Sequence, residues 1–154
     1  MRYWLMKSEP NEYSISDLKK DWISSWFGVR NYQARNFMQD NIKKGDHAFF
    51  YHSNTKIPGI VGLMTISSES IIDKTQFDKE SEYFDPKSQE ISPKWYCREV
   101  EFLEKFDTIL PLLTLKNIPE LSQMKILQKG NRLSITPLTS DEYITILPFF
   151  RKEK

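Results

Sequence analysis

The sequence has one cysteine, two histidines and five glycines among its 154 residues, and each scarcity excludes a class of protein. A lone Cys97 cannot form an internal disulfide framework or a thiolate metal cluster, and it is typical of a reducing compartment. The few glycines show none of the spacings of a phosphate-binding loop. His47 and His52 lie five residues apart in a predicted strand, so they point to opposite faces and do not share a metal ion. We therefore expect no metal site and no cofactor.

Long apolar runs are also missing. No stretch approaches the roughly 20 apolar residues that cross a bilayer. The apolar start at Met1–Lys7 is short and is followed at once by Glu9 and Pro10, which is unlike a secretory signal peptide. We therefore expect a cytoplasmic protein that does not associate with membranes.

An excess of charge of one sign is missing as well. A net charge of +1 excludes a protein that coats nucleic acid by bulk electrostatics. The charges are unevenly placed, however: residues 1–60 carry nine Lys or Arg against six Asp or Glu, whereas residues 61–100 carry five against eight. This asymmetry permits a local phosphate-binding face in the first part of the chain, although most surface charges merely keep a face solvated.

Aromatic residues are abundant, at 14% of the chain, and they gather with polar side chains in one run. The segment 26–36, Trp-Phe-Gly-Val-Arg-Asn-Tyr-Gln-Ala-Arg-Asn, combines rings, arginines and amides with little apolar surface. In a protein core, each unpaired amide or guanidinium would cost about 1–3 kcal/mol. Flat rings beside amides and cations instead suit a pocket for a planar polar ligand, such as a nucleobase.

Hydrophobic periodicity and chain breakers predict a mixed α and β protein. The expected strands are residues 3–7, 46–52, 59–72, 95–106 and 133–137. The first expected helix is capped by Ser14 or Ser16 and ends near Asp21. The other expected helices are residues 32–44, 111–117, 119–127 and 140–147, and residues 73–93 form an irregular excursion. We expect one domain over residues 1–150 and a charged C-terminal tail at residues 151–154. Strands and helices that do not alternate strictly favour a small α+β sheet or a partly closed barrel.

Four residues carry local signals. Asn31 can cap the helix that starts at residue 32, and Gly45 can close its end. Gly62, inside the long strand, marks a bulge or a close approach of backbone. Cys97 shares a strand face with carboxylates that would raise the thiol pKa, so we interpret it as structural.

Three strings of the sequence resemble the EVE domain family. They are Tyr-Trp-Leu-Met-Lys-Ser-Glu-Pro at residues 3–10, Gly-Val-Arg-Asn-Tyr-Gln-Ala-Arg-Asn at residues 28–36, and Phe-Phe-Tyr-His-Ser-Asn at residues 49–54. Weaker echoes follow at residues 59–62, 76–78, 83–88 and 132–134. The resemblance thus runs in order along nearly the whole chain.

The resemblance implies a PUA-like pseudo-barrel of about five to six strands with peripheral short helices. It also implies a non-catalytic module that binds nucleic acid and recognises a modified nucleobase, chiefly modified cytosine in DNA or RNA. Phe27 departs from the family pattern, in which an acidic residue commonly follows the tryptophan, and it lies beside the expected pocket. We expect a monomer whose partner is nucleic acid carrying a modified base.

The expected site residues follow from these strings and from the chemistry of bases. The expected base pocket comprises Ser8, Glu9, Pro10, Trp26, Val29, Asn31, Tyr32, Gln33, Tyr51, His52 and Ser53. The expected phosphate contacts are Lys7, Arg30, Arg35, Arg132 and Ser134, the last two by the resemblance alone. A ring such as Trp26 would stack on the base, and amides such as Asn31 would bond to its Watson–Crick edge. Arg30 and Arg35 have the alternative role of tying the loop to acidic residues such as Asp46.

Two other functions stay open. Lys7, Glu9 and His52 around a small cleft would suit a small-molecule-binding or hydrolytic enzyme of the PUA or ASCH kind. An aromatic-rich surface would instead suit a module that binds a partner protein. Because the sequence has no nucleophile elbow and no other activated nucleophile, the enzyme ranks last.

Overall fold

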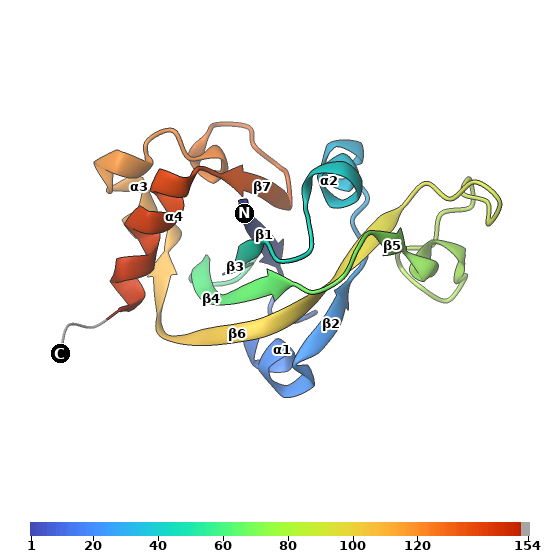
Figure 1. Cartoon of the computed structure of the whole chain (residues 1–154), viewed down its shortest axis with the longest axis horizontal. Coiled ribbons are helices and arrows are strands. Elements are labelled where there is room, and N and C mark those ends of the chain that lie inside the picture. The colour runs from blue at the N-terminus through green and yellow to red at the C-terminus, as the bar shows by residue number, and fades with distance from the viewer. Residues whose placement is uncertain (152–154) are drawn as a thin grey trace.

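The protein is built around a mixed β-sheet that runs through most of the chain (Figure 1). The computed structural model describes residues 1–151, so residues 152–154 of the predicted tail lie outside the described part. The strands are β1 (Tyr3–Ser8), β2 (Ile23–Trp26), β3 (His47–His52), β4 (Gly59–Ile66), β5 (Ile71–Ile72), β6 (Tyr96–Pro111) and β7 (Ile135–Leu138). Their order is β2-β6-β4-β3-β1-β7, with β5 paired to β6. β1 and β3 run parallel, and the other pairs run antiparallel.

The mixed α and β composition is as predicted, but the described residues form seven strands rather than five or six. The short strands β2 and β5 account for the difference. β2 has four residues and β5 has two, too few to give a recognisable alternation. Both strands exist because the long β6 offers them an edge to pair with.

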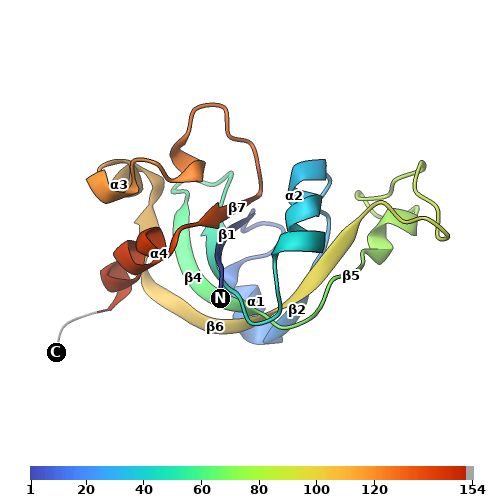
Figure 2. The same ribbon diagram turned by 45° about the horizontal axis from the view of Figure 1, so that its top comes forward.

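Short helices flank the sheet. They are α1 (Ile15–Asp21), α2 (Tyr32–Asn36), α3 (Leu112–Lys116) and α4 (Ser140–Ile146). Single turns of 3₁₀ helix lie at Lys74–Phe77, Pro119–Leu121, Lys125–Leu127 and Leu147–Phe150. In both ribbon views, α2 lies between the loop that leads into β7 and the excursion that follows β5 (Figures 1 and 2). No helix of residues 1–151 is both long and apolar enough to cross a membrane.

Alternation along the central strands divides the interior into two cores. Trp4 and Met6 of β1 belong to the first core, whereas Leu5 between them belongs to the second. In β3, Phe50 and Phe49 divide in the same way, as the period of two in a strand requires. The first core includes residues of α1 and α2, and the second includes residues of α3 and α4. The sheet therefore has apolar residues packed on both faces.

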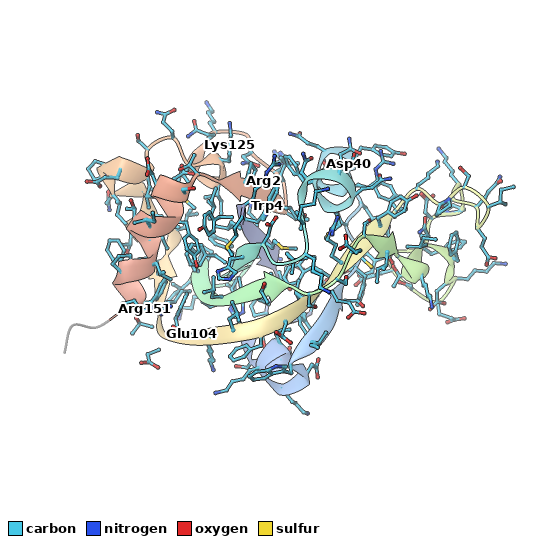
Figure 3. The ribbon with its side chains drawn as sticks, in the orientation of Figure 1. Arg2, Trp4, Asp40, Glu104, Lys125 and Arg151 are labelled. Carbon is cyan, nitrogen blue, oxygen red and sulfur yellow. The ribbon has the colours of Figure 1, made fainter. Side chains whose placement is uncertain are left out.

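Buried Asp46 fixes the start of β1 against β3. Its carboxylate accepts hydrogen bonds from the Trp4 indole Nε1 at 3.0 Å and from the Arg2 backbone N at 3.1 Å. Figure 3 shows the labelled Arg2 and Trp4 beside each other at this end of the strand. Asp46 therefore serves the sheet and is not the partner of Arg30 or Arg35. The predicted tie between an arginine of the loop and an acidic residue does occur at Arg30, but with Asp73 as the acid.

The helix expected over residues 32–44 is shorter. Asn31 caps it as predicted, because its Oδ1 accepts from two backbone N–H groups of the first turn at 2.9 and 3.1 Å. After α2 the chain widens into a π-helical turn at Phe37–Asn41, and the Ile42 N–H donates back to the Phe37 carbonyl. Ile42 is extended and fully buried in the first core, so packing ends the helix before Gly45 is reached.

The strand expected over residues 59–72 is two strands. After Ile66 the chain is joined to β6 by a side-chain hydrogen bond. The Ser68 Oγ accepts from the Glu99 backbone N at 2.8 Å. Gly62 carries the predicted irregularity: the register shifts beside it, and a Cβ there would lie 2.5 Å from Cδ1 of Ile15. A side chain at this position would collide with α1.

The remaining predictions hold to within a few residues, with two exceptions. α1 begins after Ser14, whose side chain and Asp17 form a capping box. The helix expected at residues 119–127 is instead two separate 3₁₀ turns. The strand expected at residues 95–106 extends to Pro111, because β4 continues to pair with it.

Candidate nucleic-acid interface

A cleft of about 800 Å³ opens where the end of β1, the segment from β2 to α2 and two distant loops meet. Its wall combines aromatic rings, hydroxyls, three carboxylates and three cations. The lining residues are Lys7, Ser8, Glu9, Glu12, Tyr13, Ser24, Ser25, Trp26, Phe27, Gly28, Val29, Arg30, Asn31, Ser53, Glu82, Tyr83, Arg132 and Ser134. This volume is within the range of roughly 300–1,000 Å³ typical of sites for small organic ligands.

The structure brings ten of the predicted site residues together in this cleft. They are Lys7, Ser8, Glu9, Trp26, Val29, Arg30, Asn31, Ser53, Arg132 and Ser134. The other six do not line it: Pro10, Tyr32, Gln33, Arg35, Tyr51 and His52. Residues from four distant parts of the sequence therefore share one wall.

The parallel pairing of β1 and β3 explains why the first and third strings converge. Ser8 and His52 are register partners at the ends of these strands, and the Ser53 N–H donates to the Ser8 carbonyl at 3.0 Å. On the other side of β1, the Lys7 N–H donates to the Ser134 carbonyl at 2.8 Å. The end of β1 therefore lies in the cleft, between the end of β3 and the segment that leads into β7.

Trp26 belongs to the first core and to the cleft wall at once. Its side chain is buried, with 8% exposure, and its ring lies edge-on to Phe50 with centroids 5.3 Å apart. Val29, also buried, lines the cleft close to it in the sequence. Together these residues provide an apolar corner rather than a broad exposed stacking face.

Hydrogen bonds to Asp73 fix the segment between β2 and α2. It is fully buried, and one oxygen accepts from the Gly28 backbone N at 2.8 Å and from Arg30 Nη1 at 3.0 Å. The other oxygen accepts from the backbone N and the hydroxyl of Thr75. Burial alone would raise the pKa of Asp73, but hydrogen bonds from Thr75, Gly28 and Arg30 hold it below its ordinary value.

Arg30 is occupied by the protein rather than directed at the cleft. Besides Asp73, its guanidinium donates to the carbonyl of Tyr83 through Nε at 3.0 Å and Nη2 at 2.7 Å, and to the carbonyl of Val29. The Tyr83 ring lies against Gly28, where an added Cβ would come within 2.8 Å of it, and Gly28 has a φ of +84°. Glycine is therefore needed at this position for both space and conformation.

Two cations of the cleft have no such partners. Lys7 and Arg132 form no ion pair with any residue among 1–151, where the ion pairs are Arg30–Asp73 and Arg151–Glu104. Partial burial lowers the pKa of Lys7. A partly desolvated ammonium without a carboxylate partner is well placed to gain from an anionic ligand.

The expected residues on the outer side of α2 pack against the excursion that precedes β6. The Tyr32 ring is 54% exposed and stacks on Trp95 with centroids 4.9 Å apart. The Arg35 guanidinium lies over that ring, 4.9 Å from its centroid, and donates to the Lys94 carbonyl. This pair holds α2 to the excursion, and it lies away from the cleft lining.

The expected residues of β3 are used within the fold. Tyr51 alternates with Phe50, so it lies in the second core, and burial raises its pKa to about 12. His52 Nε2 accepts from the Ile15 backbone N at 3.1 Å, and burial lowers the pKa of the imidazole. His52 thereby links the end of β3 to the start of α1.

A family model describing the EVE domain matches residues 2–149 of the chain. The chain belongs to the EVE domain family. The family expectation from the three strings is therefore confirmed.

Relatives of known structure extend this result. Human thymocyte nuclear protein 1 is 42% identical over 169 residues, which cover 98% of this chain and 75% of the relative. A protein from Leishmania major has a TM-score of 0.93 at 45% identity, covering 97% of this chain and 94% of its own. Human THYN1 protein, solved in complex with DNA containing 5-methylcytosine, has a TM-score of 0.92 at 42% identity, with both chains covered in full.

A more distant likeness concerns the fold alone. An ASCH protein from Zymomonas mobilis has a TM-score of 0.53 at 7% identity and covers 96% of this chain. The fold of the EVE chain therefore resembles that of this ASCH protein, without any implication for its chemistry.

Eight residues of the EVE cleft were not among the predicted site residues, although Phe27 was expected beside the pocket. They are Glu12, Tyr13, Ser24, Ser25, Phe27, Gly28, Glu82 and Tyr83. The two serines lie on β2, which the sequence did not reveal as a strand. Tyr83 lies in the segment of weak family resemblance at residues 83–88, which was the one available signal for the distant loop. Phe27, the departure from the family pattern, does line the cleft and lies edge-on to Tyr83 at 5.8 Å.

A second, shallower depression of about 390 Å³ adjoins the cleft. Its lining residues are Asn31, Gln33, Lys129, Gly130, Asn131, Arg132 and Leu133. Asn31 and Arg132 line both spaces, so they form a shared rim. The predicted Gln33 therefore lies next to the cleft rather than in it.

Groups suited to other chemistries lie elsewhere. Burial raises the pKa of the Cys97 thiol to about 12, with Asp73 and Glu99 adding to the effect. This agrees with the predicted structural role, although burial contributes more than the carboxylates. Within residues 1–151, no group of three or more His, Cys, Asp or Glu side chains is placed to hold a metal ion.

Proposed function

We propose that this protein binds nucleic acid without catalysing a reaction and holds one modified base, of the modified-cytosine class, in the cleft. The observation that carries the proposal is the complex of human THYN1 with DNA containing 5-methylcytosine, because that chain is 42% identical and superimposes over its whole length. The proposal covers both DNA and RNA. It includes the view that the mixed sheet is a version of the PUA-like pseudo-barrel, which the likeness to an ASCH protein supports.

The lining of the cleft is compatible with a base at its centre. Trp26 and Val29 supply the apolar corner in which a 5-methyl group would lie. Burying one methyl group contributes about 0.8 kcal/mol, which corresponds to a preference of roughly fourfold. Asn31 faces the same space, and its Oδ1 is already used as the helix cap, so its amide nitrogen is the group left to donate to the base.

The phosphate backbone would lie on the side of Lys7 and Arg132. Both are cations without ion-pair partners in the part of the chain that the structure describes. Arg30, in contrast, has its donors occupied by Asp73 and Tyr83, so we do not assign it to phosphate binding. Extracting a base from a duplex costs a few kcal/mol, so single-stranded or weakened sites are expected to bind best.

The non-catalytic assignment rests on the chemistry of the lining. Cys97 is outside the cleft, and its thiol is held protonated by burial. Glu9 accepts a hydrogen bond from Asn54 at 2.5 Å, and His52 is engaged by the backbone of Ile15. None of these groups forms a pair in which a base activates a nucleophile.

Fluorescence anisotropy with short labelled oligonucleotides tests the proposal. The probes are single- and double-stranded DNA and RNA, each with one cytosine or one 5-methylcytosine. We expect tighter binding to the methylated single strands. If no probe binds more tightly than about 10⁻⁴ M, the weak end of non-specific affinities at physiological salt, the proposal is wrong.

Asn31→Ser tests the amide. Serine caps a helix about as well as asparagine, so α2 should be preserved while the amide donor is lost. We expect a loss of affinity of about three- to tenfold for the methylated probe, as for one net hydrogen bond. Asn36→Ser is the matched control, because Asn36 lies at the other end of α2 and outside the cleft. Equal affinities of the two variants would exclude Asn31 from base recognition.

Trp26→Phe tests the apolar corner. The smaller ring keeps an aromatic contact with Phe50 but withdraws surface from the cleft wall. We expect the ratio of affinities for methylated and plain probes to fall towards one, while binding to the plain probe changes little. An unchanged ratio would place the methyl group elsewhere.

A further inference from the structure

Two of the three glutamates that line the cleft lie on one side of it. Its two cations without ion-pair partners, Lys7 and Arg132, lie on the other side, together with the third glutamate, Glu9. On one side the Tyr83 hydroxyl donates to Glu12, and Glu82 is its neighbour in the chain. On the other side Lys7 pairs through its backbone with Ser134, two residues from Arg132. A polyanionic strand is repelled by the first side and attracted by the second.

The second depression continues the basic side. It shares Asn31 and Arg132 with the cleft and adds Gln33 and Lys129. Its lining contains no carboxylate, so a phosphate there meets two cations and amide donors only. The depression therefore differs from the cleft, which contains three glutamates.

Side-chain amides hold the loop that carries the two cations. Gln128 Nε2 donates to the carbonyls of Ser122 and Met124, at 3.1 and 3.2 Å. Asn131 Nδ2 donates to the Lys125 carbonyl, and its Oδ1 accepts from the Leu133 backbone N at 2.8 Å. These bonds shape the loop without using either cation.

The tip of this loop presents its charges outward. Gly130, with a φ of +80°, makes the turn between the two cations. Lys129 and Arg132 are exposed and form no ion pair with any residue among 1–151. The protein thus holds two uncompensated cations beside the rim of the cleft, on a backbone fixed by other residues.

We propose that the depression between Gln33 and Lys129 binds the phosphodiester of a nucleotide flanking the modified base. The strand leaves the cleft over the rim formed by Asn31 and Arg132, and the side of Glu12 and Glu82 stays free of phosphate. This inference rests on the proposed function, because it assigns the path of the strand whose base occupies the cleft. It adds the position and chemistry of a second subsite, in which Lys129 supplies charge and Gln33 an amide donor.

A ladder of ligand lengths separates the two sites. The probes are 5-methyl-2′-deoxycytidine monophosphate and a trinucleotide with 5-methylcytosine at its centre. Binding is followed by calorimetry at several salt concentrations for the parent, for Lys129→Ala and for Lys125→Ala. Lys125, labelled in Figure 3, lies before the same loop but lines neither space, so its removal controls for the loss of one positive charge.

We expect Lys129→Ala to weaken trinucleotide binding by about fivefold, the size of one exposed ion pair. Its salt dependence should fall by about 0.7 in the slope of log affinity against log salt concentration. Mononucleotide binding should be unchanged, and Lys125→Ala should match the parent with both probes. A second trinucleotide carries a neutral methylphosphonate in place of one flanking phosphodiester. The parent should bind this neutral probe as weakly as Lys129→Ala binds the native trinucleotide. Lys129→Ala should bind the neutral and the native trinucleotides equally well.

The outcomes separate this inference from the proposed function. If the parent binds both probes but Lys129→Ala and Lys125→Ala behave alike, the flanking subsite is wrong and the base site stands. Equal losses for mononucleotide and trinucleotide in Lys129→Ala would also overturn it, since the lysine would then act on the base-bearing nucleotide. If the parent binds neither probe, the base site itself fails.

Discussion

The two walls of the cleft use their cations in opposite ways. On the clamped wall, formed by Gly28, Arg30 and Tyr83, the guanidinium is saturated by the buried carboxylate of Asp73 behind the wall and by backbone carbonyls. On the open wall, formed by Lys7, Asn31 and Arg132, the charges have no ion-pair partner within residues 1–151. Both walls come from segments that resemble the family strings, yet only the open wall has charge to spare for a ligand.

The role of a cation in a binding site therefore does not depend on residue type alone. An arginine whose five donors are used by the protein is a structural element, whatever its distance from the cleft. A lysine that is partly desolvated and unpaired is stabilised by an incoming anion. The clamped wall fixes the shape of the cleft, and the open wall is left to bind.

The largest effect should follow from breaking the clamped wall at its centre. Asp73→Ala leaves the Arg30 guanidinium and the Gly28 N–H without their acceptor, and breaking a buried pair costs about 3–5 kcal/mol. We expect the free energy of unfolding in urea to fall by at least about 3 kcal/mol. Asp40→Ala, an exposed carboxylate of the π-helical turn, is the control and should change it by less than about 0.5 kcal/mol. Similar losses in the two variants would mean that the clamp contributes little.

A pair of substitutions sharpens the comparison between the walls. Arg30→Lys keeps the charge but loses the planar fork, so stability should fall by about 1–2 kcal/mol while the salt dependence of oligonucleotide binding stays the same. Arg132→Ala should do the reverse, with stability within about 0.5 kcal/mol of the parent and a salt slope reduced by about 0.7. Urea unfolding and anisotropy at several salt concentrations measure the two effects. A reduced salt slope in Arg30→Lys would remove the distinction between the walls.

The smallest effect concerns His52, which was predicted for the base pocket but instead forms a hydrogen bond within the fold. Its pKa is lowered in the folded state, so the stability that it contributes is present above its ordinary pKa of about 6.5. That stability is lost as the pH falls through the lowered value, because protonation removes the acceptor for the Ile15 N–H. We expect His52→Gln, whose amide oxygen can still accept, to lose less stability than the parent between pH 7 and pH 5. The melting temperature of both proteins is measured across this pH range. An equal fall in melting temperature for the two proteins would contradict the assignment.

His47 provides the reference for this measurement. Burial also lowers its pKa, but it lies at the start of β3 and contacts Tyr143 rather than the cleft. It is retained in His52→Gln, so a residual fall in stability below pH 6.5 is expected in both proteins.

Much of the fold could be predicted because its signals are local. Apolar periodicity placed β1, β3 and the main part of β6, and the cap at Asn31 fixed where α2 begins. For α1 the sequence left Ser14 and Ser16 as alternative caps, and Ser14 is the one used. The errors occur where packing overrides propensity. Ile42 is buried in the first core and ends the helix early, and β6 supplies the edge on which β2 forms.

The candidate site was predicted in composition better than in roles. Ten of the expected residues share the cleft, because the family strings lie at the ends of paired strands. Tyr51 and His52 do not line the cleft. The alternation of β3 places Tyr51 in the second core, and His52 accepts a hydrogen bond from Ile15 of α1. No feature near residue 30 in the sequence indicates that Asp73 and Tyr83 would occupy its guanidinium.

The amino-acid sequence alone was enough to assign the family, the main strands, the Asn31 cap of α2 and ten of the residues that line the cleft. These depend on side-chain periodicity and on contacts within a few residues. Which cations lack an ion-pair partner depends on the folded chain, because an ion pair such as Arg30–Asp73 joins residues that are 43 positions apart. A charge becomes available to a ligand when the folded chain leaves it without a partner, and that is a property of the whole arrangement.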